Sequence, residues 1–215
     1  MRTVMFRVRE ASRPEDKKVR YKPQYVILPG RRGGEPIYVV RGLPPGTDEP
    51  PGGLRPRFTL YGDVACEKPL CIVARRTTEQ SGERRLVVLT PSFEEIGFLT
   101  KPPRRKRWRP QWKVEPVGGR TLVGHSGTIP AWVLFILLSP LWLAVNVVWL
   151  LDSTGDWAFS LPSRTAWRAD RPWSFSLAPL KYYGLTERYK LRAGRLDPRL
   201  GYAQSVVHWE ASHPA

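Results

Sequence analysis

The sequence predicts a mainly β protein: an antiparallel barrel or sheet of short strands, with one long hydrophobic helix and a C-terminal helix. Three observations support this fold class. Short apolar segments recur at regular spacing between residues 57 and 127, the run 129–151 has no charged side chain, and residues 196–212 carry helix start signals. Apolar residues make up 41% of the chain, which argues against a disordered protein.

The recurring segments are rich in Val, Ile, Leu and aromatic residues, and they read RFTLYG, LCIVARR, RRLVVLT, EIGFLT, QWKVEP and RTLVGH. Gly, Pro or charged turns separate them. Evenly spaced short strands with such turns are typical of an antiparallel sheet or barrel. No helical period of 3.6 residues lies between them, so an alternating α/β architecture is disfavoured.

Composition divides the chain into four regions. These are a Pro- and Gly-rich region with short strands (1–56), a β-rich region (57–127), a hydrophobic helix (128–151) and a second β-rich region with the terminal helix (152–215). In the last region DWAFSLPS, WSFSLAPL and RYKLRA alternate only in part, but they could complete one barrel with residues 57–127. The N-terminal MRTVMFRVREAS is not expected to be a signal peptide, because charges interrupt it.

The run from Ile129 to Leu151 is long enough to cross a membrane. Its 23 residues would form about 34 Å of helix, against roughly 30 Å of bilayer hydrocarbon. Tryptophans lie near both ends, where their rings favour the membrane interface. We therefore predict a membrane segment marked by Ile129, Trp132, Pro140, Trp142, Asn146, Trp149 and Leu151.

Pro140 leaves the path of this segment open. It lies near the middle of the run and should kink a helix there. A kinked span, a re-entrant hairpin and a buried helix are the three alternatives. A single span would place residues 57–127 and 152–215 on opposite sides of the membrane, where one closed barrel could not form.

The stretch KPPRRKRWRP carries six cations within nine residues, in a chain of net charge +16. It could be a solvated hairpin tip, a nucleic-acid contact or a surface that lies on anionic lipid. We favour lipid, because each Lys or Arg near such a surface contributes roughly 1 kcal/mol and the apolar run would keep the stretch close to the bilayer. The predicted lipid-binding residues are Lys101, Arg104, Arg105, Lys106, Arg107, Trp108 and Arg109.

Charge around the apolar run predicts its orientation in a cell membrane. Arg109, Lys113 and Arg120 approach it from the N-terminal side, whereas the first cation after it is Arg164. The positive-inside rule then places the N-terminal side in the cytoplasm. Abundant Arg and Pro, with Asn146 as the only asparagine, resemble the usage of high-GC bacteria.

Gly124-His125-Ser126-Gly127-Thr128 follows an apolar strand, as a hydrolase nucleophile elbow does. The elbow pattern is G-x-S-x-G, but Thr128 replaces its last glycine. Ser126 with Asp170 or Asp197 and His208 would fill the order of a catalytic triad. The alternating strand and helix scaffold of these enzymes is missing, so a serine hydrolase is a remote alternative. Otherwise Ser126 simply turns the chain out of a hairpin strand.

Other chemistry is weakly represented. Cys66 and Cys71 could close a small loop, but no histidine lies near them and we interpret them as two free thiols. No HExxH, paired carboxylate or phosphate-cradling loop is present. We therefore predict no metal, no cofactor and no enzymatic activity.

The C-terminal segment LDPRLGYAQSVVHWEAS predicts the final helix. Asp197 can cap its N-terminus and Pro198 suits the first helical position. Leu200, Ala203, Val207 and Ala211 would then lie on one face.

The segments LVVLTPSFEEIGFLT, WKVEPVGGRTLVG and LDPRLGYAQSVV together resemble the tubby-like superfamily, in particular its scramblase-like and LURP-one-related branch. The resemblance covers residues 57–127 and 185–212. It implies a closed barrel of repeated short strands threaded by a hydrophobic C-terminal helix, with phosphoinositide binding through basic surface residues. The calcium-related and palmitoylated-cysteine motifs of the family are not recognisable here, so scramblase activity is not supported.

These observations lead to one principal hypothesis and one alternative from another class. The first is a non-enzymatic bacterial membrane protein whose basic β-rich domain engages anionic lipid headgroups. The alternative is a membrane-tethered module that binds nucleic acid or protein through the same basic surface.

Overall fold

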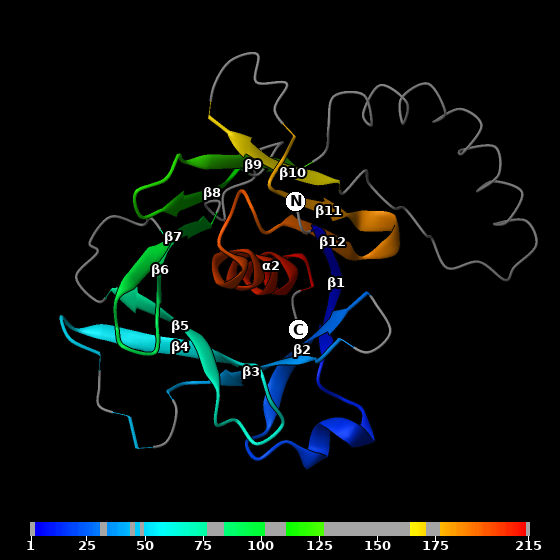
Figure 1. The fold of residues 1–215 in the computed structure, drawn as a ribbon, viewed down its shortest axis with the longest axis vertical. Coiled ribbons are helices and arrows are strands. Elements are labelled where there is room, and N and C mark those ends of the chain that lie inside the picture. The colour runs from blue at the N-terminus through cyan, green and yellow to red at the C-terminus, as the bar shows by residue number, and fades with distance from the viewer. Residues whose placement is uncertain are drawn as a thin grey trace, which may run out of the picture.

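The computed structural model describes residues 3–30, 34–43, 46–47, 50–76, 84–101, 111–126, 164–170 and 177–213. Its strands form a closed antiparallel barrel that surrounds a C-terminal α-helix (Figure 1). The predicted fold class is therefore confirmed in its barrel and in its terminal helix.

The barrel has twelve strands. They are β1 (Thr3–Glu10), β2 (Pro23–Pro29), β3 (Ile37–Arg41), β4 (Leu54–Tyr61), β5 (Pro69–Arg76), β6 (Arg84–Leu89), β7 (Glu95–Lys101), β8 (Gln111–Pro116), β9 (Leu122–Ser126), β10 (Thr165–Ala169), β11 (Leu180–Tyr183) and β12 (Arg188–Arg192). The helical elements among the described residues are η1 (Pro14–Lys18), η2 (Gly184–Thr186) and α2 (Pro198–Ser212).

Each strand pairs with its neighbour in the sequence, and β12 closes the barrel against β1. Phe6 of β1 lies opposite Tyr189 of β12, and their rings stack at a centroid distance of 5.4 Å. Strands from residues 1–56, 57–127 and 152–215 thus belong to one sheet. The closure leaves no free edge for pairing with another chain.

The hydrophobic run interrupts the sequence of the barrel but not its sheet. β9 pairs directly with β10, and Ser126 lies opposite Thr165. The chain therefore leaves and rejoins the barrel at neighbouring points. A single crossing between β9 and β10 is incompatible with this pairing, because it would separate the two strands by the width of a bilayer.

The predicted membrane segment itself lies outside the described residues, as do its markers Ile129, Trp132, Pro140, Trp142, Asn146, Trp149 and Leu151. Among the residues that the structure describes, no helix combines the length and the apolar composition needed to cross a bilayer. The long hydrophobic helix of the predicted fold class is therefore not supported by the described chain.

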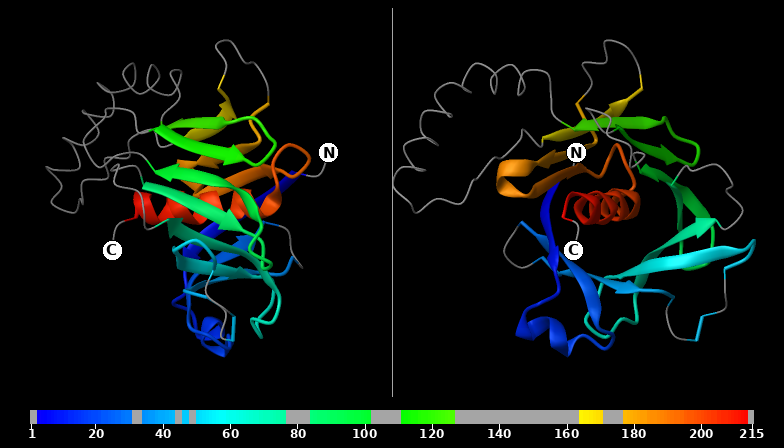
Figure 2. Two further views of the ribbon diagram at one scale, coloured as in Figure 1. Left: turned by 90° about the vertical axis from the view of Figure 1, so that its left-hand side faces the viewer. Right: turned by 180° about the vertical axis from the view of Figure 1, so that it is seen from behind.

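The helix lies in the barrel because twelve strands enclose more space than their own side chains fill. Eight strands suffice to pack a lumen with side chains alone. Here α2 occupies the ring in Figure 1, and the side view in Figure 2 shows it running through the barrel toward the C-terminus. It packs on inward-facing side chains that include Phe6, Phe58, Val73, Leu99, Trp112, Trp167, Leu180, Tyr189 and Leu191.

The start of α2 follows the prediction, whereas its buried surface does not. An oxygen of the Asp197 carboxylate accepts a hydrogen bond from the Arg199 backbone N–H at 2.8 Å, and Pro198 is the first helical residue. Of the predicted face, Ala211 is exposed. The buried positions instead surround the helix, because the barrel wall does: Leu200, Gly201, Ala203, Gln204, Ser205, Val206, Val207, His208 and Trp209.

Neighbouring strands alternate in direction, so the connections alternate between the two mouths of the barrel. The C-terminal mouth holds the connections after β1, β3, β5, β7, β9 and β11, and α2 ends there. Glu210 in the last turn of α2 forms ion pairs with Arg57 and, at 3.3 Å, with Lys101 at the end of β7. The N-terminal mouth holds the other connections and the first turn of α2.

His208 makes the fold sensitive to acid. It is 3% exposed, its Nδ1 lies 3.0 Å from the Tyr189 hydroxyl oxygen, and burial, with a smaller contribution from His213, lowers the pKa of its ring to about 3. In the unfolded chain the same ring titrates near 6.5. The unfolded state therefore binds the proton first as the pH falls.

We expect the free energy of unfolding to decrease between about pH 6.5 and 3 by up to about 1.4 kcal/mol per pH unit from this residue alone. Urea unfolding at a series of pH values measures the slope. His208→Gln should flatten it, whereas His213→Gln, a change near the C-terminus, should leave it in place. An unchanged slope in His208→Gln would contradict the assignment of this pH dependence to His208.

Candidate functional site

A basic face covers the outer surface of four adjacent strands, β10, β11, β12 and β1. Successive side chains of a strand point to opposite sides of the sheet. Tyr189 and Leu191 of β12 point into the core, so Arg188, Lys190 and Arg192 point outward. We define the basic face by Arg7, Arg164, Arg168, Lys181, Arg188, Lys190 and Arg192.

The strand register places like charges directly opposite one another. Lys181 of β11 is the partner of Lys190, and Arg7 of β1 is the partner of Arg188. Opposed like charges destabilise a sheet. Two such pairs on neighbouring strands therefore lower the stability of the sheet. Packing of the barrel does not require them, because all four side chains point away from its core.

The cations of this face are not held in ion pairs with carboxylates in the described part of the chain. None of the ion pairs among the described residues includes a member of the basic face. The pKa of Lys181 is lowered by partial burial and, in decreasing order, by Arg164, Arg192, Arg168 and Lys190. Four neighbouring cations thus act on one lysine in the same direction.

The face also has apolar and aromatic character. Met5, opposite Lys190, is 39% exposed. The Arg164 guanidinium carbon lies 5.3 Å from the ring centroid of Tyr183, a cation–π contact. An array of cations around an exposed apolar side chain can bind a surface of repeated negative charges that has apolar material beneath it.

The predicted lipid-binding stretch is placed only in part. Lys101 is 11% exposed and its Nζ is engaged by Glu210, so its charge is directed into the C-terminal mouth. Arg104, Arg105, Lys106, Arg107, Trp108 and Arg109 lie outside the described residues. Their stretch joins β7 to β8 and so begins and ends at the C-terminal mouth.

Of the residues considered for a serine hydrolase, His208 and Asp197 lie apart in the structure. His208 is buried in the lumen, and Asp197 caps the start of α2. They are eleven positions apart along α2, about 16 Å on its axis, which is too far for a hydrogen-bonded acid–base pair. Asp170 is exposed beyond β10, and Ser126 ends β9.

Sequence reasoning missed the basic face because its members come from distant parts of the chain. A local signal was nevertheless present: in RYKLR (188–192) cations alternate with Tyr and Leu, which is the pattern of a strand with one charged and one buried side. The same alternation occurs in LKYY (180–183).

Metal-ligating side chains and thiols are placed as follows in the described part of the chain. No group of three or more His, Cys, Asp or Glu side chains there could hold a metal ion. Cys66 and Cys71 are both free and buried, and burial raises the pKa of the Cys71 thiol to about 12.

Comparison with known proteins gives no relative: no family model, no curated protein and no solved structure matches this chain.

Proposed function

We propose that this protein is a non-enzymatic bacterial membrane protein whose barrel binds anionic lipid headgroups. The basic face provides the contacts, together with the stretch 101–109. The apolar run 129–151 holds the barrel at the bilayer. The barrel lies on the cytoplasmic side, where anionic lipids attract basic surfaces.

The uncompensated charge of the basic face carries this proposal. Cations that oppose one another across strands weaken the isolated barrel, and a partner with negative charge would remove the repulsion. The topology adds a second reason for a membrane partner. Arg164 directly precedes β10 and Arg168 belongs to it, and β10 is the strand that follows the apolar run. The stretch 102–110 joins its strands at the same mouth as that run.

We also propose that the chain belongs to the tubby-like superfamily. The observed closed barrel with a helix in its lumen agrees with the architecture that the resemblance of the sequence implies. Membership would be supported independently if a relative with the family's motifs could be linked to this chain through intermediate sequences.

Flotation with vesicles of phosphatidylcholine alone, or with one third phosphatidylserine, tests the lipid proposal. We expect the full chain to bind the anionic vesicles more tightly. Arg7→Gln, Lys181→Gln, Arg188→Gln and Lys190→Gln together should remove most of this difference. Each cation near an anionic surface contributes roughly 1 kcal/mol, so the expected loss is at least about 100-fold in the partition coefficient.

A matched variant controls for net charge. Lys17, Lys18, Arg55 and Lys68 are exposed and lie outside the basic face, and their replacement by Gln removes the same four charges. This control should retain the preference for anionic vesicles. Equal losses in the two variants, or binding that ignores lipid charge, would contradict the proposal.

A shortened chain separates the barrel from the apolar run. Because Ser126 lies opposite Thr165, an Asn-Gly turn in place of residues 127–164 can close the same hairpin, with the loss of one cation of the basic face, Arg164. We expect this chain to keep its preference for anionic vesicles.

Two outcomes would favour another function. Tighter binding of the protein to nucleic acid at the same ionic strength would favour the alternative function. Fluorophosphonate labelling that is lost in Ser126→Ala would favour a hydrolase.

A further inference from the structure

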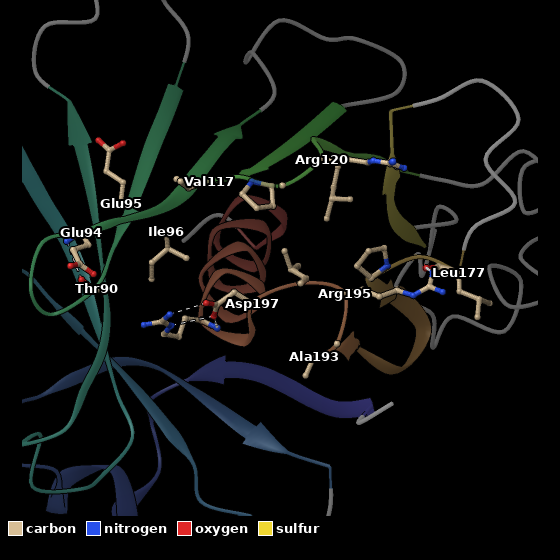
Figure 3. Close-up of a pocket in the computed structure, with 18 residues that line it drawn as sticks. Thr90, Glu94, Glu95, Ile96, Val117, Arg120, Leu177, Ala193, Arg195 and Asp197 are labelled. Atoms are coloured by element: carbon tan, nitrogen blue, oxygen red, sulfur yellow. Dashed lines mark hydrogen bonds and ion pairs between the residues drawn. The ribbon is translucent and has the colours of Figure 1, made fainter.

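A hollow of about 860 Å³ lies at the N-terminal mouth, around the first turn of α2 (Figure 3). Its walls come from the connections β6–β7 and β8–β9, from the residues before β11 and from the link between β12 and α2. The volume falls in the range of small-molecule sites. It shares no residue with the basic face.

The hollow has apolar side chains that are open to solvent. Val117 is 59% exposed and Leu177 is 55% exposed. Only four large hydrophobic side chains of the described chain are exposed, and these two line the same hollow. They extend an apolar wall that also includes Ile96, Pro116, Leu122 and Pro179. Exposed apolar surface with a polar rim indicates an interaction site.

The rim beside Leu177 is positive. Figure 3 shows Arg120 and Arg195 on the Leu177 side of the hollow, with Thr90 and Glu94 on the other. Arg195 Nη1 donates a hydrogen bond to the Leu177 carbonyl at 2.8 Å. Among the described residues neither arginine forms an ion pair with a carboxylate.

The remaining carboxylates of the lining do not neutralise this side. Asp197 pairs with Arg199 at 2.8 Å and caps α2, and Glu95 pairs with Arg76 at 3.5 Å. Glu94, across the hollow, opposes entry of an anion on its own side. The hollow thus has an apolar wall, a positive rim on one side and a carboxylate on the other. A ligand that fits all three has one anionic end at the arginines and an apolar body along the wall.

We propose that the hollow binds a single-chain anionic amphiphile, with its carboxylate at Arg120 and Arg195 and its acyl chain along Val117 and Leu177. The inference is independent of the lipid-surface proposal, because none of its residues belongs to the basic face.

The test uses a twelve-carbon fatty acid that carries a photoreactive diazirine, cross-linked to the full chain and mapped by peptide mass spectrometry. Labelled peptides should contain residues 116–122 or 177–196. Excess dodecanoate should compete and dodecanol should not. Arg120→Gln with Arg195→Gln should reduce the yield at least about tenfold at subsaturating ligand, because two charge-assisted contacts are lost.

Two further variants keep the test decisive. Lys17→Gln with Lys18→Gln removes the same charge outside both the hollow and the basic face and should leave labelling unchanged. Val117→Glu leaves both arginines in place and should weaken labelling by placing a carboxylate in the apolar wall. Unchanged labelling in the arginine variant, equal competition by dodecanol, or labels on the basic face would overturn the proposal.

Discussion

Cysteines introduced at Lys18 and at Thr186 will react with a membrane-impermeant maleimide from the same side of sealed membrane vesicles. Lys18 precedes the apolar run in sequence and Thr186 follows it, and both positions are exposed. The direct pairing of β9 with β10 fixes this result. A chain that leaves and rejoins one closed sheet at neighbouring points cannot end on opposite sides of a bilayer while the barrel is intact.

The expected difference is all or none. With the proposed cytoplasmic orientation, both variants should label in inverted vesicles, which expose the cytoplasmic side, and neither should label in right-side-out vesicles. The native thiols provide the background control, because both are buried and burial raises the pKa of each, so little reactive thiolate is present. Labelling of the two variants from opposite sides would mean that the barrel does not form in the membrane.

The strands between residues 54 and 126 could be predicted because each carries a local signal. Their residues either alternate between apolar and polar or form a continuous apolar segment, and turn residues lie at both ends. β1 has the same alternation, with Phe6 and Val8 buried and Val4 partly buried, but it was not predicted as a strand from the sequence. β10 was missed because TAWRA is short and its pairing is set by β9 and β11.

Closure of the barrel and the position of the helix depend on the whole chain. The helix carries buried Gln204, Ser205 and His208, so its sequence does not show that every side is enclosed. The basic face could not be predicted from the sequence either, because only the strand register brings Lys181 opposite Lys190 and Arg7 opposite Arg188. By contrast, the stretch 101–109 is recognisable as a cation cluster from the sequence alone, but in the structure Lys101 pairs with Glu210.

Gly124→Ala will destabilise the barrel, because Gly124 makes room for Trp167. The two residues lie opposite each other on β9 and β10. An added Cβ would meet Trp167 at 2.8 Å from Nε1 and 2.9 Å from Cδ1 and Cε2. Trp167 is fully buried against His208 and cannot move aside. We expect a loss of about 1–3 kcal/mol in the free energy of unfolding, as for other overpacked cores.

A double-mutant cycle identifies steric conflict as the cause. Trp167→Phe removes part of the indole and should itself cost stability, but Gly124→Ala should then cost less by at least about 0.5 kcal/mol. Gly62→Ala is the matched control, since its Cβ would meet Leu70 at an ordinary 3.5 Å. Urea unfolding measures all four variants. Coupling between the two substitutions would assign Gly124, the first glycine of the elbow-like sequence around Ser126, to packing of the barrel. Strict additivity would mean that Gly124 is required for another reason, and the elbow-like sequence would again need an explanation.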